Sequence, residues 1–226
     1  DLGALGITDY GGIANSGFSW KAPLAHMELF LDGHPMRLAQ WPNRAWTKIR
    51  AVPKGKRIVD SSGKPRGTAA DRFGYTGDRP ARWQSLADVW VHGYWFVDWA
   101  DQYLKIKGID ADTRMITIEP PHGPYGYKQG QRFRFLNVLE ELDEPGEWYL
   151  DRQTGKLYAW PTTPAGQHEG VVSILSQPLV TFTDTSDVQL VGLTLQGGRS
   201  DGVRITGGNR VHIAGCDVRN LGGGGV

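Results

Sequence analysis

The chain has 226 residues and a formal net charge of +1, from 25 basic and 24 acidic side chains. The two signs are interspersed, so the sequence has no electrostatic footprint for nucleic acid or for an anionic membrane surface. No apolar run approaches the roughly 18 residues of a membrane span. The 31 Gly and 13 Pro, without a long helical periodicity, favour an all-β chain that is rich in turns.

The first quarter of the chain predicts an opening segment followed by short strands. Residues 1–25 suggest no chemistry, and we interpret them as this opening segment. Two apolar runs flank Asp32-Gly33, which is a strong hairpin signal. Residues 51–77 are rich in Lys, Arg, Gly and Ser, and no aromatic residue interleaves with the basic residues at positions 54–66. The passage therefore favours a solvated surface excursion over a site for an acidic polymer.

The middle of the chain holds its densest group of aromatic residues, at positions 89–106. Alternate residues of a strand face opposite sides, so about half of these rings are expected to be core. Sugar rings stack their apolar CH faces on indoles, while neighbouring polar groups hydrogen-bond the hydroxyls. We therefore predict a substrate-binding group at Trp95, Trp99, His92 and Asp98.

Residues 137–161 predict a short helical turn followed by a hairpin with its tip at residues 151–155. The adjacent acids Glu140 and Glu141 lie in that turn. Neighbouring residues of a helical turn do not face one another, so we interpret the pair as structural rather than catalytic. Residues 162–170 are a polar linker, and a domain boundary is expected at its end.

The last forty residues contain an internal repeat with a period of 23 residues. With this shift, Val188 corresponds to Val211 and Leu190 corresponds to Ile213. Short alternating apolar pieces that are broken by Gly, Asn and Asp at a fixed period are typical of a solenoid coil. Each coil would contain three short strands with Val, Leu and Ile pointing inward.

Four stretches of the chain carry a resemblance to a known group of proteins. They are residues 27–43, 88–101, 130–161 and the coil at 207–220. Together they resemble bacterial right-handed parallel β-helix proteins related to glycoside hydrolases, including families of β-xylosidases, α-L-fucosidases and xylanases. In such proteins a small barrel-like β domain is inserted between an early strand region of the β-helix and the main solenoid.

The resemblance implies a fold, a domain order and a function. We expect residues 26–168 to form a β-barrel-like or β-sandwich-like inserted domain and residues 169–226 to begin a right-handed parallel β-helix. The implied function is hydrolysis of glycans derived from plant or algal polysaccharides, by a periplasmic or secreted protein. The chain begins with Asp1 and stops within a coil, so we expect it to be an internal piece, with the family's catalytic carboxylates beyond Val226.

Within the visible coils, two outward carboxylates are the candidates for catalysis. Glycoside hydrolysis usually needs two carboxyl groups flanking the glycosidic oxygen. Asp201 stands at a loop-to-strand junction that equally suits an ordinary turn, and Asp217 is close in sequence to Arg219, where an exposed ion pair is the alternative. Arg204 could bind the carboxylate of a uronic acid. The scattered His residues have no ligand spacing, so the sequence predicts no metal site and no cofactor.

Three functions remain open at the level of sequence. The first is the glycoside hydrolase, whose partners would be an oligo- or polysaccharide and the remainder of the same β-helix protein. The second is a polysaccharide lyase on the same scaffold, with a Lys, Arg or Tyr base beside a uronate carboxylate. The third is a non-catalytic module that binds carbohydrate or is purely structural.

Overall fold

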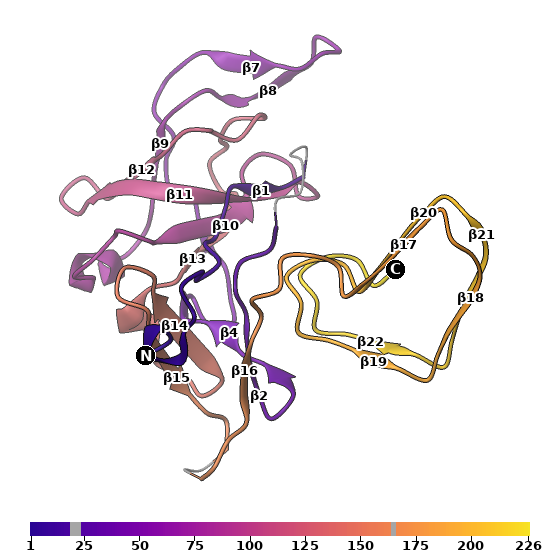
Figure 1. Ribbon diagram of the computed structural model, residues 1–226. Helices are drawn as coiled ribbons and strands as arrows, with labels where there is room; N and C mark the ends of the chain where they lie inside the picture. The colour runs from indigo at the N-terminus through magenta and orange to yellow at the C-terminus, as the bar shows by residue number, and fades with distance from the viewer. Residues whose placement is uncertain (19–23, 164–165) are drawn as a thin grey trace. The chain divides into compact units, whose positions relative to one another are not determined.

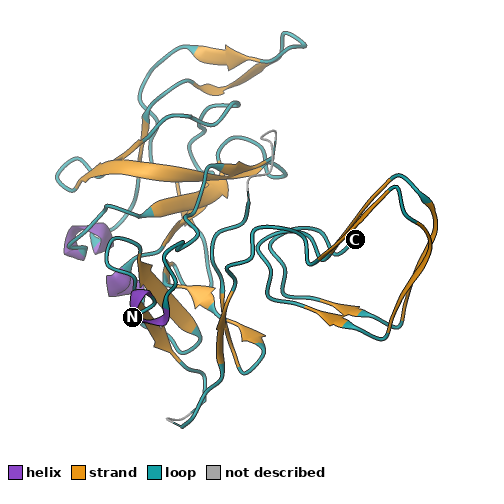
Figure 2. Cartoon of the chain, viewed as in Figure 1, coloured by secondary structure: helices purple, strands orange, loops and turns teal. Residues whose placement is uncertain are grey.

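The computed structural model describes residues 1–18, 24–163 and 166–226, and these residues form strands and loops almost throughout (Figures 1 and 2). The predicted all-β class is therefore confirmed. Helical structure in the described part is limited to short 3-10 turns, none of them long or apolar enough to cross a membrane. These turns are η1 (Gly3–Leu5), η2 (Arg79–Arg82) and η3 (Leu139–Glu141).

The chain divides into two compact units. The first unit contains Asp1, Ala14–Pro23 and Arg37–Thr162, and the second contains Leu2–Ile13, Leu24–Met36 and Thr163–Val226. This division differs from the expected order of residues 1–25, 26–168 and 169–226. The hairpin near residue 32 joins the second unit because one of its strands pairs with a strand that follows the linker. Residues 19–23 of the expected opening segment and residues 164–165 of the expected inserted domain lie outside the described residues.

The first unit is built on an antiparallel sheet. In the described residues the strand order is β5-β13-β10-β11-β12-β9, with β1 also on β11 and β6 also on β13. Edge strands β5 and β9 do not pair with each other in this part of the chain, and no closed barrel is found there. Ala51, which follows β6, forms an isolated antiparallel bridge with Gly74 of β9. The strands are β1 (Ser16–Gly17), β5 (Gln40–Trp41), β6 (Thr47–Lys48), β9 (Arg72–Gly74), β10 (Trp90–Tyr94), β11 (Asp101–Asp110), β12 (Met115–Ile118) and β13 (Arg132–Leu136).

One face of this sheet forms the hydrophobic core of the unit. The two-residue period of a strand buries Phe133 and Phe135 of β13 and turns Arg132 and Arg134 to the opposite face. Rings and aliphatic side chains from β9, β10, β11 and β12 complete the same core. Its fully buried members include Phe73, Trp95, Leu104, Ile116, Ile118 and Tyr127.

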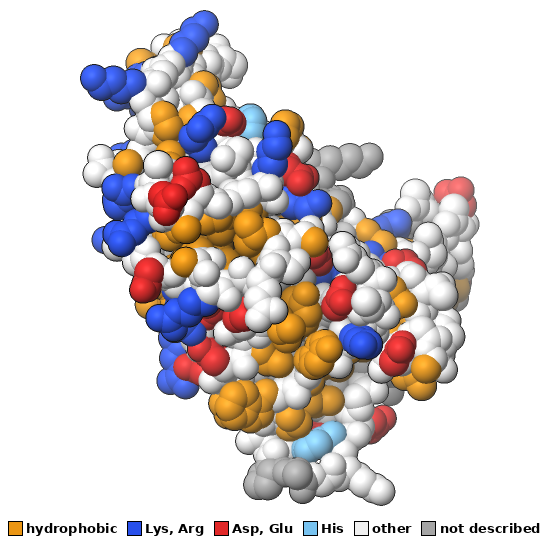
Figure 3. All heavy atoms as spheres, turned by 90° about the vertical axis from the view of Figure 1, so that its left-hand side faces the viewer, with side chains coloured by type: hydrophobic (Ala, Val, Ile, Leu, Met, Phe, Trp, Pro, Cys, Tyr) orange, Lys and Arg blue, Asp and Glu red, His pale blue; other side chains and the backbone are white. Residues whose placement is uncertain are grey.

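Two hairpins complete the first unit. The predicted hairpin tip at residues 151–155 is confirmed, since β14 (Glu147–Asp151) and β15 (Lys156–Trp160) pair antiparallel, and β4 (Arg37–Leu38) runs parallel to β14. The Lys- and Arg-rich passage forms a second hairpin, β7 (Arg57–Val59) with β8 (Pro65–Thr68). Figure 3 shows blue side chains at the end of the molecule where Figure 1 places β7 and β8, in line with a solvated excursion.

The second unit contains the predicted hairpin around residue 32. β2 (Leu29–Leu31) pairs with β3 (His34–Pro35) and also with β16 (Gly170–Val172). Asp32 and Gly33 have φ angles of 51° and 77°. Two central residues with positive φ are what the two-residue type I′ turn requires, which explains why Asp-Gly stands here.

The 23-residue repeat forms two stacked turns of chain. The predicted alignment is confirmed, because Val188 pairs with Val211 and Leu190 with Ile213 in a parallel register. Figure 1 shows the orange and yellow turns following one another around the same path. The parallel pairs are β17 (Val180–Thr183) with β20 (Val203–Thr206), β18 (Ser186–Val191) with β21 (Asn209–Ala214), and β19 (Thr194–Leu195) with β22 (Asp217–Val218).

Candidate functional site

The face of the first unit's sheet that lies opposite the core carries a continuous group of aromatic and charged side chains. Its position follows from register, because His92 of β10 lies between Arg134 of β13 and Tyr103 of β11. Trp46, from the loop before β6, adds an indole to this face. We call this group the aromatic–arginine band; it consists of Trp46, His92, Tyr94, Asp98, Asp101, Tyr103, Arg132 and Arg134.

Two arginines of the band are stacked on aromatic rings. The guanidinium carbon of Arg134 lies 3.8 Å from the ring centroid of Trp46, and that of Arg132 lies 4.0 Å from the centroid of Tyr94. The Trp46 and Tyr94 rings are themselves 5.7 Å apart. Stacking of this kind attracts the cation to the ring quadrupole and fixes the planar guanidinium in one orientation.

His92 is fixed by stacking and by one hydrogen bond. Its ring lies 4.2 Å from that of Tyr103 with an interplanar angle of 13°, and its Nε2 is 2.9 Å from Oδ2 of Asp101. Burial lowers the pKa of His92, and the neighbouring Asp101 carboxylate opposes this shift only in part. A neutral imidazole whose Nε2–H donates to Asp101 is the form that this geometry favours.

The two arginines of the band differ in whether a carboxylate neutralises their charge. Arg132 forms an ion pair with Asp98, whose side chain is 72% exposed, so the pair contributes little to stability. Arg134 donates through Nη1 to the neutral Gln40 side chain at 3.3 Å, and it has no ion pair with any described carboxylate. Burial lowers the pKa of Arg134. The band therefore contains a rigid cation that no carboxylate of the described residues neutralises.

The structure separates the residues that the sequence predicts as a sugar-binding group. His92 and Asp98 belong to the band. Trp95 is 2% exposed and packs against Phe73 and Tyr127, so its predicted role as a platform is wrong. The reason is strand alternation: Tyr94 faces the band, and the next residue turns into the core.

Trp99 offers an exposed ring close to the band. Its side chain is 58% exposed, and it contacts Phe18 edge-to-face at 4.7 Å and Tyr125 at 6.0 Å. The preceding residue in the sequence, Asp98, accepts a hydrogen bond from Arg132 of the band. A platform role for Trp99 stays a prediction that this geometry permits.

Sequence reasoning missed Trp46, Arg132 and Arg134 of the band. Tyr94 and Tyr103 lie in the aromatic group predicted at positions 89–106, but they were not among the residues predicted to bind substrate. The Arg-Phe-Arg-Phe alternation at 132–135 was a usable signal, because it places two arginines on the face opposite two buried rings. Trp46 had no such signal, since its position depends on how a loop returns to the sheet.

The two candidate catalytic carboxylates belong to the second unit and are engaged in local contacts. Asp201 accepts the backbone N–H of Gly224 at 2.8 Å and an N–H of Arg204 at 2.8 Å. Arg204 first, and then the Gly224 amide, hold the pKa of Asp201 below its usual value. Asp217 pairs with Arg219 at 2.5 Å. These contacts are those of a turn and an exposed ion pair, and a catalytic role for either residue stays a prediction.

The chemistry of the band is that of binding. Its aromatic faces can stack on the CH faces of sugar rings, and its imidazole, carboxylate and guanidinium groups can hydrogen-bond hydroxyls. Its two carboxylates already have cationic or imidazole partners, Arg132 for Asp98 and His92 for Asp101. In the described ranges, no group of three or more His, Cys, Asp or Glu side chains is placed to hold a metal ion.

Comparison with known proteins yields one structural likeness. No protein-family model matches the sequence, and no curated protein matches it. A solved structure described as "Glycoside hydrolase" superposes with a TM-score of 0.51 at 16% sequence identity, covering 78% of this chain. The chain spans 32% of that protein's length. At this identity the likeness concerns the fold.

Proposed function

We propose that the protein is part of a carbohydrate-active enzyme of the glycoside hydrolase type, in which the first unit binds an oligosaccharide through the aromatic–arginine band. The fold likeness to a glycoside hydrolase supports a function related to carbohydrate. The two parallel turns with a 23-residue period support a right-handed parallel β-helix as the second unit. Action on plant or algal glycans, and a periplasmic or secreted location, belong to the same proposal.

The observation that carries this proposal is the stacking of arginines and aromatic rings on the sheet face opposite the core. Trp46, Tyr94 and Tyr103 present ring systems there, and Arg134 holds a charge that no described carboxylate neutralises. A face that only packs against other parts of the protein would be expected to carry aliphatic side chains in place of these arginines and rings. Aliphatic side chains fill space without polar groups that need hydrogen-bond partners. Sugar rings use both parts of such a surface, through their CH faces and their hydroxyls.

The proposal is tested by measuring oligosaccharide binding with a glycan array followed by calorimetry. We expect Trp46→Ala to weaken binding at least about tenfold, because it removes the ring on which Arg134 stacks and on which a sugar would lie. Trp160→Ala is the matched control, because Trp160 is 46% exposed and lies on β15, away from the band's strands. Trp99→Ala in the same assay decides whether the exposed ring beside the band takes part.

Binding that is unchanged in Trp46→Ala, or equally weakened in Trp160→Ala, would contradict the role of the band.

A non-catalytic carbohydrate-binding module is the second candidate function. The observation in its favour is that Asp201 and Asp217 are each paired with an arginine, Arg204 and Arg219. Hydrolysis of the bound glycan by this chain would contradict the second function.

A further inference from the structure

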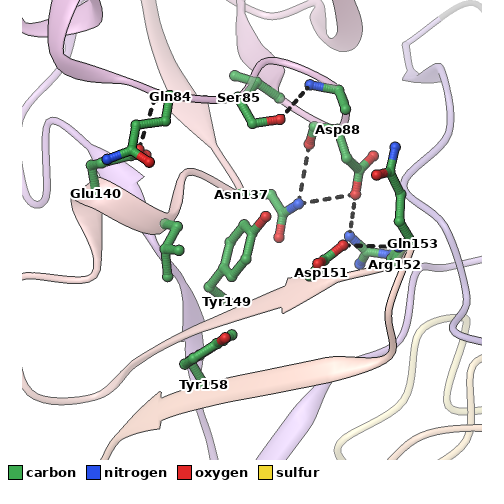
Figure 4. A pocket seen from close by; sticks show the side chains of 13 residues that line it. Gln84, Ser85, Asp88, Asn137, Glu140, Tyr149, Asp151, Arg152, Gln153 and Tyr158 are labelled. Carbon is green, nitrogen blue, oxygen red and sulfur yellow. Dashed lines mark hydrogen bonds and ion pairs between the residues drawn. The ribbon is translucent and has the colours of Figure 1, made fainter. Parts of the chain in front are cut away.

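The first unit contains a pocket that shares no residue with the band. It has a volume of about 410 Å³, within the roughly 300–1,000 Å³ of small-molecule sites. It lies between the β14–β15 hairpin, residues 84–89 and residues 137–140 (Figure 4). The side chains that matter for its chemistry are Asp88, Asn137, Glu140, Tyr149, Asp151, Arg152 and Tyr158.

One wall of the pocket is a rigid hydrogen-bond network centred on Asp88. Its carboxylate accepts from Trp90 Nε1 at 2.9 Å, from Asn137 Nδ2 at 2.9 Å and from Arg152 Nη1 at 2.6 Å. These contacts occupy Asp88 and hold Asn137 and Arg152 in place. The network therefore fixes the shape of this wall. The atoms left to bind a ligand are those of the Asn137 amide and the Arg152 guanidinium that do not contact Asp88.

Those remaining atoms lack partners. Asn137 is 1% exposed and lines the pocket, yet its Oδ1 accepts no hydrogen bond from the described residues. Figure 4 shows this oxygen on the side of the network that faces Tyr149. Nε and Nη2 of Arg152 are likewise buried without a partner in the described part of the chain. The pocket thus combines an unsatisfied acceptor with unsatisfied donors, and a hydroxyl group can complement both because it donates and accepts.

The opposite wall is aromatic. Tyr149 and Tyr158 are directly cross-strand partners, with ring centroids 6.2 Å apart, and Tyr158 is 42% exposed. Figure 4 shows the two rings on the two strands of the hairpin, below Asn137 in the view. A pair of tyrosines in this arrangement offers an apolar surface beside polar groups, which suits the two-sided chemistry of a sugar ring.

Charge in the pocket is predominantly negative. Asp88, Glu140 and Asp151 line it together with the single cation Arg152. Burial raises the pKa of Tyr149, and the charges of Asp151, Asp88 and Glu140 raise it further against the opposing effect of Arg152. The carboxylates would repel an anionic ligand and weaken its binding, whereas a neutral or cationic ligand would not be repelled.

We infer that this pocket is a second carbohydrate site that takes a neutral or amino sugar residue and excludes uronates. The inference goes beyond the proposed function and does not depend on it, because no residue of the aromatic–arginine band lines the pocket. The two sites differ in their charge. The band carries the unneutralised cation Arg134, and the pocket carries a surplus of carboxylates.

The experiment is a titration of the isotope-labelled protein with monosaccharides, followed by amide chemical shifts. The probes form matched gluco and galacto series, each consisting of the neutral sugar, the 2-amino sugar and the uronate. We expect shifts at residues 84–89, 137–140 and 149–158 with a neutral or amino sugar, and at least about fivefold weaker binding of the matching uronate. The residues whose amide shifts change show whether a sugar binds in the pocket or on the band. Failure of the pocket proposal therefore leaves the band proposal untested, and the reverse also holds.

Two variants complete the test, each with a control. Tyr158→Ala should weaken binding of the neutral sugar about tenfold, whereas Trp160→Ala, with similar exposure on the same strand, should not. Glu140→Gln keeps the acceptor for the Gln84 amide and should strengthen uronate binding about fivefold. Glu119→Gln, at a carboxylate outside the pocket, should leave it unchanged. Equal or tighter binding of the uronate by the unaltered protein, no pocket shifts with any probe, or an unaffected Tyr158→Ala would each overturn the inference.

Discussion

Glu141 shows at the scale of one residue how the turn at η3 is fixed. It is 1% exposed, and its carboxylate accepts from Arg79 Nε at 2.7 Å and from Trp83 Nε1 at 2.7 Å. Its neighbour Glu140 points elsewhere and accepts the Gln84 amide. The interpretation of the adjacent acids as structural rather than a facing pair agrees with this geometry, but the distant partners Arg79 and Trp83 carried no sequence signal.

Removal of the Glu141 carboxylate should destabilise the first unit. Glu141→Ala leaves the indole N–H of the buried Trp83 without a partner, which costs about 2–3 kcal/mol of unfolding free energy. Asp71→Ala, which breaks only an exposed ion pair with Arg72, should cost less than about 1 kcal/mol. Urea unfolding followed by tryptophan fluorescence measures both. Similar losses in the two variants would mean that the buried carboxylate has no special role.

At the scale of elements, the sequence predicted what depends on local patterns. The Asp32-Gly33 hairpin, the hairpin tip at 151–155 and the 23-residue register each follow from turn chemistry or from a repeat. The order of strands in the sheet of the first unit could not be obtained in the same way. The neighbours of β10 are β11 and β13, and that choice is made by packing of residues distant in sequence. For this reason Trp46, which a loop brings to the sheet, was missed. Trp95 was misplaced for a local reason, because strand alternation turns it into the core.

The stacked turns depend on a glycine at a point of close backbone approach. Gly208 has a φ of 71°, and a Cβ there would meet the carbonyl oxygen of Thr185 at 1.9 Å. Gly215 has a φ of 60° but only open space around a Cβ, with the nearest atom at 4.0 Å. Gly215→Ala should therefore cost about 1 kcal/mol of backbone strain, and Gly208→Ala should cost more, because backbone atoms must also move.

Hydrogen exchange at the amides of β18 and β21 is the suitable measurement, because it reports on the second unit alone. We expect protection in this pair to fall further in Gly208→Ala than in Gly215→Ala. Equal protection in the two variants would show that positive φ, rather than the approach to Thr185, sets the requirement for glycine at position 208.

At the scale of the whole chain, segments far apart in sequence make up the second unit. Leu2–Ile13 and Leu24–Met36 fold with Thr163–Val226, and Arg37–Thr162 lies between them in sequence. Composition and periodicity could not show this, because residues 1–25 carry no strong pattern of their own. The connection depends on particular contacts, among them β2 with β16 and the backbone N–H of Met27 with the Gly11 carbonyl oxygen at 2.9 Å.

Arg199 is one of the side chains that make this long-range connection. It is 7% exposed, and it donates to the Ala25 carbonyl oxygen at 2.8 Å and to the Asp9 carboxylate at 3.1 Å, across 174 and 190 positions of sequence. Because Asp9 is 73% exposed, its ion pair adds little. The larger loss in Arg199→Ala comes from the carbonyl left without its donor and from the emptied side-chain volume, together about 2–4 kcal/mol.

The expected consequence is local to the joined segments. In Arg199→Ala the Met27 amide, which is bonded to Gly11, should exchange much faster, while amides of β10 and β13 in the first unit keep their protection. Arg219→Ala removes an arginine that is 52% exposed and pairs with Asp217, and it should leave the Met27 amide unaffected. If both variants left that amide equally protected, the segments would be held by β2 and β16 without help from Arg199. A selective loss would show that one buried guanidinium connects the start of the chain to the first turn of the repeat.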